Sequence, residues 1–192
     1  SMSAEQIQSL DTATVRGLDA AHISKLTTEQ VAGLTTDQVK ALQASQLTSM
    51  TSDQLVAMST EQLKELSGAQ LNGIETGDLV NLSTEQISSL ASDSVSGLST
   101  SQINNLTTAQ FSVLSSDQIQ KMTTAQVQAI STAQAARLSA EQITAMSTAQ
   151  VASLETADLA KLNSEQVQAL SQTAVEALST AQVAALTDRK ST

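Results

Sequence analysis

Residues 26–33 read LTTEQVAG, and the same eight-residue phrase returns at once as LTTDQVKA (34–41), LQASQLTS (42–49), MTSDQLVA (50–57) and MSTEQLKE (58–65). The shared pattern, L-[S/T]-x-x-Q-[V/I/L]-x-x, can be laid over essentially the whole chain. A repeat of fixed period without insertions indicates an array of small structural units. We number the positions of each octad from its first apolar residue.

Two positions of the octad are apolar throughout. Position 1 recurs every eighth residue from Met2 to Leu186 and is Leu, Met or Ile in all 24 cases. Position 6 runs from Ile7 to Val183 and is apolar in all 23 cases. Position 5 is Gln in 17 of 23 octads, and position 2 is Ser, Thr, Asp or Asn in 20 of 24. Each unit therefore offers two side chains to a core, with polar positions of fixed type between them.

A single long helix and a β-solenoid both fit this pattern poorly. In a continuous helix of about 100° per residue, the apolar pair turns by roughly 80° with each octad, so no single face stays dry. In a strand, positions 1 and 6 point to opposite faces, although both are equally apolar. Gln, Glu, Ala, Leu and Met are also poor strand residues.

A short helix restarted in every octad accounts for all four recurrent features. Position 2 is then the N-cap, and the Gln at position 5 reaches back to its N–H in a capping box. Positions 1 and 6 flank this box as a hydrophobic staple. The sequence predicts an all-α solenoid or superhelix of very short capped helices, one per octad. We expect residues 1–192 to form a single repeat domain of about 23 octads, from Met2 to Ala185, with a short tail at 186–192.

The distribution of charge agrees with a helix start in every octad. Of the 19 acidic residues, 16 lie at positions 2, 4 or 5, in the expected cap and first turn. Seven of the nine basic residues lie at positions 7 or 8, at the expected helix end. A helix dipole favours this sorting by about 0.3–1 kcal/mol per charge. Position 8 is Gly in only four octads, so we expect the N-cap residue to form the corner between helices.

A longer period lies inside the short one. Thr14, Ser94 and Ala174 replace Gln at position 5 and are 80 residues apart, as are Asp78 and Asp158. Around these two Asp residues the whole cap changes together, to IETGDL in one octad and LETADL in the other. Two explanations stay open. A ten-octad block was duplicated, or ten octads complete a whole number of superhelical turns and place these octads on one side.

The composition removes most kinds of reactive site. The chain has one Phe and no Trp, Tyr or Cys, so it lacks aromatic pocket walls and thiolate chemistry. His22, the only His, stands at position 5 and is expected to be a substitute cap side chain, since no second His or Cys could share a metal ion.

Two octads each contain a pair of carboxylates three residues apart. Glu75 with Asp78, and Glu155 with Asp158, could hold a hard cation or act as acid and base. Neither pair has a basic or aromatic companion within its cap segment, residues 74–79 or 154–159, so we interpret both as modified caps. We predict no catalytic, metal-binding or cofactor-binding residues and no cofactor.

The charge of the chain narrows the classes of partner. A net charge of −10 disfavours nucleic acid and anionic membranes. No run of 18 apolar residues exists, so we expect no membrane insertion. A protein or glycan partner and self-association both stay open.

Two resemblances bear on fold and location. LTTEQVAGL (26–34) resembles the opening helix of transcription-activator-like effector repeats, whose consensus is L-T-P-x-Q-V-V-A-I. The resemblance covers about nine residues and implies a helix here, but the second helix and base-reading loop of that family are missing. The run of L-[S/T]-[S/T]-A-Q-V octads is similar to segments of very large bacterial surface, adhesin-like or haemagglutinin-like repeat proteins. That resemblance spans most of the chain and implies a secreted or cell-surface spacer.

These observations predict a protein that is not an enzyme. The first hypothesis is a structural spacer or scaffold segment of a larger bacterial surface or secreted protein. The alternative is a solenoid binding module whose groove, formed by positions 3, 4 and 7, holds a peptide, glycan or partner protein.

Overall fold

The computed structural model describes residues 3–187, and every regular element within them is an α-helix. This part of the chain has 23 helices, about one per octad, and no strand, which confirms the predicted all-α solenoid. Met2 and residues 188–192 of the predicted tail lie outside the described residues. The helices are α1 (Ala4–Gln8), α2 (Thr12–Arg16), α3 (Ala20–Ile23), α4 (Thr28–Ala32), α5 (Thr36–Ala41), α6 (Ala44–Thr48), α7 (Ser52–Val56), α8 (Thr60–Lys64), α9 (Gly68–Gly73), α10 (Thr76–Leu79), α11 (Thr84–Ser89), α12 (Ser92–Val95), α13 (Thr100–Asn105), α14 (Thr108–Ser112), α15 (Ser116–Lys121), α16 (Thr124–Gln128), α17 (Thr132–Ala135), α18 (Ala140–Ala145), α19 (Thr148–Ser153), α20 (Thr156–Leu159), α21 (Ser164–Gln168), α22 (Gln172–Glu176) and α23 (Thr180–Thr187).

Each helix begins one residue after position 2 of its octad. In α4 the N-cap is Thr27, whose Oγ1 accepts a hydrogen bond from the N–H of Gln30 at 3.2 Å. Gln30 Oε1 in turn accepts from the N–H of Thr27 at 2.7 Å. The same reciprocal pair recurs along the chain, for example in α8, α15 and α21. The cap residue and its Gln therefore restart the helix in octad after octad.

The corner between successive helices is formed by the N-cap residue. Thr27 has φ −75° and ψ 161°, and Ser115 has φ −69° and ψ 161°, so both are extended. An extended residue directly after a helix ends that helix and redirects the chain. No residue of the described range has a positive φ, so the corners need no glycine.

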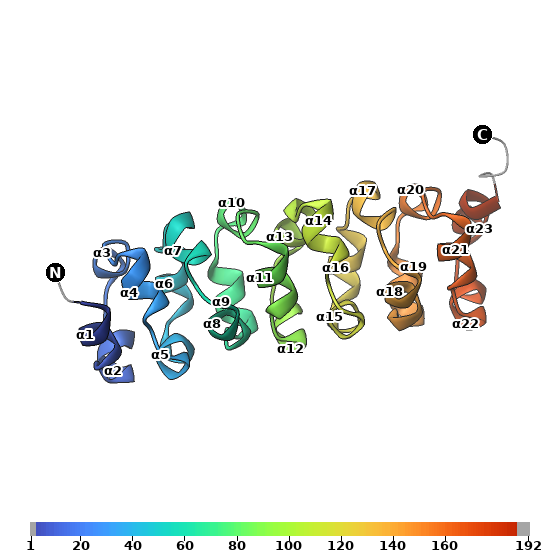
Figure 1. Ribbon diagram of the computed structural model, residues 1–192. Helices are drawn as coiled ribbons and strands as arrows, with labels where there is room; N and C mark the ends of the chain where they lie inside the picture. Colours follow the sequence, from blue (N-terminus) through green and yellow to red (C-terminus); the bar gives the residue numbers. More distant parts are fainter. Residues whose placement is uncertain (1–2, 188–192) are drawn as a thin grey trace.

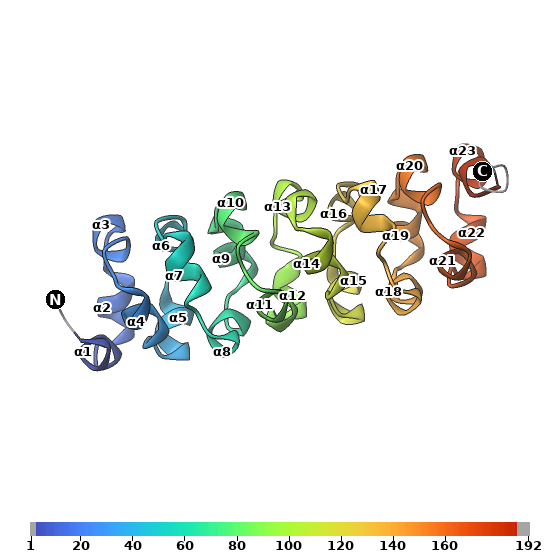
Figure 2. The same ribbon diagram turned by 45° about the horizontal axis from the view of Figure 1, so that its top comes forward.

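The helices wind into an elongated superhelix, with α1 at one end of the molecule and α23 at the other (Figures 1 and 2). Each helix packs on the helix three octads later, as in α6 on α9, α12 on α15 and α15 on α18. Hydrogen bonds from Gln at position 5 also join many helices to the one four octads earlier, as in α17 and α13. One turn of the superhelix therefore takes between three and four octads.

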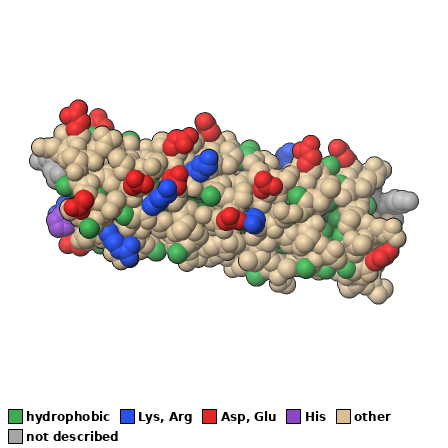
Figure 3. Space-filling view, turned by 90° about the horizontal axis from the view of Figure 1, so that it is seen from below, with side chains coloured by type: hydrophobic (Ala, Val, Ile, Leu, Met, Phe, Trp, Pro, Cys, Tyr) green, Lys and Arg blue, Asp and Glu red, His purple; other side chains and the backbone are tan. Residues whose placement is uncertain are grey.

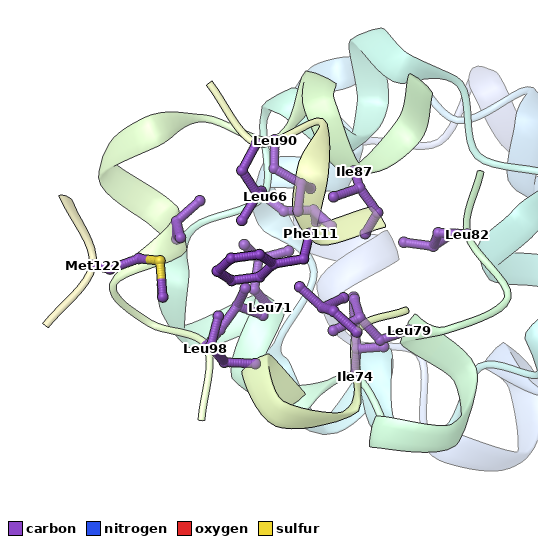
Figure 4. Close-up of a cluster of buried hydrophobic side chains, with 14 of the residues drawn as sticks. Leu66, Leu71, Ile74, Leu79, Leu82, Ile87, Leu90, Leu98, Phe111 and Met122 are labelled. Carbon is purple, nitrogen blue, oxygen red and sulfur yellow. The ribbon is translucent and has the colours of Figure 1, made fainter. Parts of the chain in front are cut away.

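The core is a continuous column filled by positions 1 and 6. Leu47, Leu55, Leu63 and Leu71, all at position 6, are fully buried. Figure 4 shows the ring of Phe111, the largest of these side chains, close to Leu71 and Leu98 from earlier octads. Helices of four to eight residues are far too short to be stable alone, so this shared column holds them in place.

The superhelix brings the octads of the 80-residue period to common edges. Figure 1 shows α10 and α20 at the upper edge of the molecule, and α2, α12 and α22 at the lower edge. Octads ten apart therefore occupy matching places around the axis. This arrangement agrees with ten octads completing a whole number of turns, and it is also compatible with duplication of the block.

Candidate functional site

The side-chain amide of Gln at position 5 makes hydrogen bonds both within its own helix and to an earlier turn of the superhelix. Gln134, in α17, is fully buried. Its Oε1 accepts from the N–H of Ser131 at 2.7 Å, which caps its own helix. Its Nε2 donates to the carbonyl oxygens of Ile103 at 2.9 Å and Leu106 at 2.8 Å, at the end of α13. One amide thus joins the start of one helix to the end of the helix four octads earlier. We call this arrangement the glutamine bridge.

The glutamine bridge recurs in every octad that has Gln at position 5 from Gln38 onward. Donor–acceptor distances from Nε2 to the closest carbonyl lie between 2.6 and 2.8 Å, and that carbonyl always belongs to the position-1 residue 28 residues earlier. A buried amide whose donors and acceptor are all satisfied stabilises the fold, by about 1 kcal/mol per bond. The bridges therefore hold successive turns together along the molecule.

The sequence predicts half of this contact. A capping box explains why Gln accepts from the N-cap N–H, but Glu at position 5 would serve that purpose equally. Glu occurs at position 5 in none of the 23 octads. Only the amide can donate as well as accept, so this strict choice was the signal for a partner beyond the helix.

The octads without Gln lack this donor. Asp158, in α20, is 1% exposed, and its Oδ2 accepts from the N–H of Glu155 at 3.3 Å. The pair therefore acts as a modified cap. Burial, and secondarily the charge of Glu155, raise the pKa of Asp158 to about 6, although the hydrogen bond from Glu155 lowers it. Asp78 takes another partner, since Ser52 Oγ of the preceding turn donates to its Oδ1.

His22 also belongs to a cap, although its contact differs from that of Gln. Its N–H donates to Oδ1 of the N-cap residue Asp19 at 2.9 Å, and its ring Nδ1 lies 2.7 Å from the same oxygen. These contacts from His22 lower the pKa of Asp19. Both side chains are exposed, so the predicted cap role fits the structure.

Shallow hollows lie between successive turns on the surface. One of about 420 Å³ is lined by Thr100, Ser101, Asn104 and Asn105 of α13, by residues 128–130, and by Glu155. A second of about 590 Å³ is lined by Thr60, Glu61 and Lys64 of α8 and by residues 88–93. Positions 3, 4 and 7 of one octad line both hollows, as the predicted groove requires.

Polar side chains at position 7 reach from one turn to the next, and that of Asn104 does so at the first hollow. Asn72 Nδ2 donates to the carbonyl of Gly97 at 3.1 Å, and Asn104 Nδ2 donates to the carbonyl of Ala129 at 2.8 Å. Thr48 Oγ1 donates to the carbonyl of Gly73 at 2.7 Å. Part of the groove is therefore occupied by contacts within the protein itself.

Comparison with known families identifies the octad. A family model described as the ALTTAQ repeat matches residues 3–44, 71–108, 96–124, 119–156 and 151–188, which together make up more than half of the chain. The chain belongs to the ALTTAQ repeat family. No curated protein matches the sequence.

The letters of the ALTTAQ repeat fit the geometry described above. They correspond to position 8 of one octad followed by positions 1 to 5 of the next, as in ALSTAQ at 177–182. The bridging Gln is thus the last letter of the family name. The chain is a repeat protein and a structural repeat segment. The comparisons lend no support to the resemblances to adhesin-like proteins or transcription-activator-like effectors.

Two further observations concern the described part of this ALTTAQ chain. It contains no group of three or more His, Cys, Asp or Glu side chains placed to hold a metal ion. Among the same residues, no helix has both the length and the apolar character needed to cross a membrane.

Proposed function

We propose that this ALTTAQ chain is a non-catalytic spacer or scaffold segment of a larger protein that is secreted or displayed on a bacterial surface. The observation that carries the proposal is the glutamine bridge. In most octads it commits a buried amide to joining one turn to the next, and the result is an elongated rod with its ends far apart (Figure 1). Such a rod separates whatever is attached at its two ends.

Small-angle scattering together with circular dichroism tests this proposal. A compact chain of 192 residues would have a radius of gyration of roughly 16 Å, and an unfolded one roughly 47 Å. We expect a helical spectrum, an intermediate radius and a rod-like scattering profile. A helical spectrum with the compact radius would rule the spacer out.

The second candidate function is a binding module for a peptide, glycan or protein. The hollows lined by positions 3, 4 and 7 favour it, since they repeat between turns. Deletion of one octad, residues 122–129, separates the two functions. A spacer keeps its activity with a slightly shorter reach, whereas a groove binder loses affinity because the hollow between α13 and α16 is lost.

A further inference from the structure

Charged residues are absent from one set of octads. Seven octads contain no Asp, Glu, Lys, Arg or His: the octad of α14, and six others that belong to α6, α9, α13, α16, α19 and α23. We call the exposed side of these six octads the charge-free stripe. The six octads are 42–49, 66–73, 98–105, 122–129, 146–153 and 178–185.

These six helices are neighbours in space. α6 packs on α9, α13 on α16, and α16 on α19. The remaining links are glutamine bridges, because Gln102 of α13 donates to the carbonyls of Leu71 and Ile74 at the end of α9, and Gln182 of α23 donates to that of Leu154 after α19. The charge-free stripe is therefore continuous from α6 to α23 along one side of the rod.

The acidic residues gather on other helices. Ten of them stand at position 4, and their helices pack in the rows α1–α4–α7, α5–α8–α11 and α12–α15–α18–α21. Ion pairs between turns, such as Lys40 with Glu65 at 2.9 Å, lie in the same rows. Figure 3 shows charged side chains concentrated toward one edge of the molecule, while the opposite edge carries almost none between the two ends.

The chemistry of the charge-free stripe suits contact with itself. Its exposed positions carry hydroxyls, amides and methyl groups, for example Ser45, Asn104 and Ala125. Hydroxyls and amides both donate and accept hydrogen bonds, so two copies of this surface can be complementary to each other. The stripe also has low relief where α6 and α9 meet, because Gly73 lies directly against the backbone of Ala44.

We infer that the charge-free stripe is the surface on which a second copy of this chain docks side by side. Two rods with a net charge of −10 repel each other wherever their acidic rows meet. The charge-free stripe is the side of the rod where they can approach with few like charges brought together, although Glu155 lies beside α13 and α16. Its lack of Trp and Tyr disfavours a sugar polymer, which usually stacks on such rings. This inference is independent of the proposed spacer function.

The test places negative charges on the charge-free stripe by a substitution that the octad already tolerates. Glu occupies position 4 in other octads, as at Glu29 and Glu61, so the triple variant Ala69→Glu/Ala125→Glu/Ala149→Glu should fold. The control is Ala109→Glu on α14, whose octad is also uncharged but whose neighbours α10, α11, α17 and α18 all carry charge. All four alanines are exposed at position 4.

The measurement is sedimentation equilibrium over a concentration series at low and high salt. We expect the wild-type chain to associate, more strongly at high salt, and the triple variant to bind itself at least about tenfold more weakly. The self-association constants of the Ala109→Glu variant and the wild type should agree within about twofold. Ala125→Glu alone should fall between wild type and triple variant.

Several results would overturn the inference. These are a wild type that stays monomeric at every concentration and salt, a triple variant that associates as the wild type does, and an Ala109→Glu variant that is weakened equally. Retention of a monomeric wild type on a neutral glucan column would instead assign the charge-free stripe to a glycan. Circular dichroism of every variant ensures that only folded protein is compared.

Discussion

At the scale of single residues, the difference between Gln and Glu is one donating group, and the glutamine bridge depends on it. Gln134 donates to Ile103 and Leu106 from a site with no exposure to solvent. A carboxylate there would face two carbonyl oxygens with nothing to donate, while keeping its capping bond. The same change at Gln6, which is exposed and caps Ser3, leaves no buried acceptor without a partner.

We therefore expect Gln134→Glu to lower the free energy of unfolding by about 2–4 kcal/mol, because it buries a charge against carbonyl oxygens. Gln6→Glu should change it by less than about 0.5 kcal/mol. Urea unfolding followed by circular dichroism measures both. Equal losses at the two positions would mean that the bridge contributes nothing beyond the cap.

Asp158 makes a pH-dependent contribution to the stability of the fold, and the substitution of this one residue can measure it. Its pKa is about 6 in the folded chain against an ordinary value of 3.8, so the folded state holds the proton more tightly. Its contribution to stability is fully present below the ordinary value of 3.8 and is lost as the pH rises through about 6. The buried carboxylate destabilises the fold at neutral pH by on the order of 2 kcal/mol.

Asp158→Asn removes this titration, so we expect the variant to be the more stable protein at pH 7 and to lose that advantage at pH 4. Thermal melts of both proteins at several pH values give the difference. The comparison cancels the titration of the other carboxylates, which the two proteins share. A difference in stability that does not change between pH 4 and pH 7 would contradict the raised pKa.

At the scale of helices, the close approach between α9 and the end of α12 depends on two glycines. A Cβ added at Gly97, after α12, would lie 2.2 Å from the Cα of Gly68 in α9. Both are backbone positions, so neither can give way as a flexible side chain does. Gly77, in α10, is the opposite case, since nothing lies within 4 Å of an added Cβ.

Gly97→Ala should cost about 1–3 kcal/mol of stability through overpacking. Gly77→Ala should instead stabilise the protein by about 0.5–1 kcal/mol, because alanine loses less backbone freedom in a helix. Differential scanning calorimetry of the two variants would give melting shifts of opposite sign. Shifts of the same sign would show that α9 and α12 do not approach as described.

The helices and their caps could be predicted from the octad, because each rests on residues within eight positions of one another. The number of octads per turn could not. It depends on the backbone dihedrals at every corner, and small differences between them, such as ψ 161° at Thr27 and 176° at Asn163, cannot be read from the octad pattern. The carbonyl acceptors of the glutamine bridge could not be predicted either, because they lie 28 to 31 residues away and their position depends on the number of octads per turn. That positions 3, 4 and 7 line surface hollows could be predicted, because it needs only the direction of side chains on a short helix.

At the scale of the whole molecule, the length of the rod should follow the number of octads. Deletion of residues 74–153 removes ten octads and replaces IETGDL by the closely similar LETADL at the junction. Every remaining helix then meets neighbours of the type it had before. We expect a folded, cooperatively melting protein with a smaller radius of gyration and an unchanged rod-like cross-section.

Small-angle scattering and thermal melting check this expectation. Deletion of five octads, residues 74–113, is the matched comparison, because it joins helices from different edges of the molecule and breaks the charge-free stripe. We expect it to fold with a similar cross-section but with weaker self-association. A ten-octad deletion that collapses or aggregates would contradict the equivalence of α10 and α20.

The fractional number of octads per turn has a consequence for how such a chain can change its length. Adding one octad rotates everything downstream, so surfaces that had faced the same way diverge. Copying ten octads at once moves the distal part outward without rotating it, because α10 and α20 share an edge (Figure 1). Duplication of a ten-octad block and a whole number of superhelical turns would therefore leave the same 80-residue period in the sequence. Such a rod can therefore become longer and keep the orientation of its surfaces only if octads are added ten at a time.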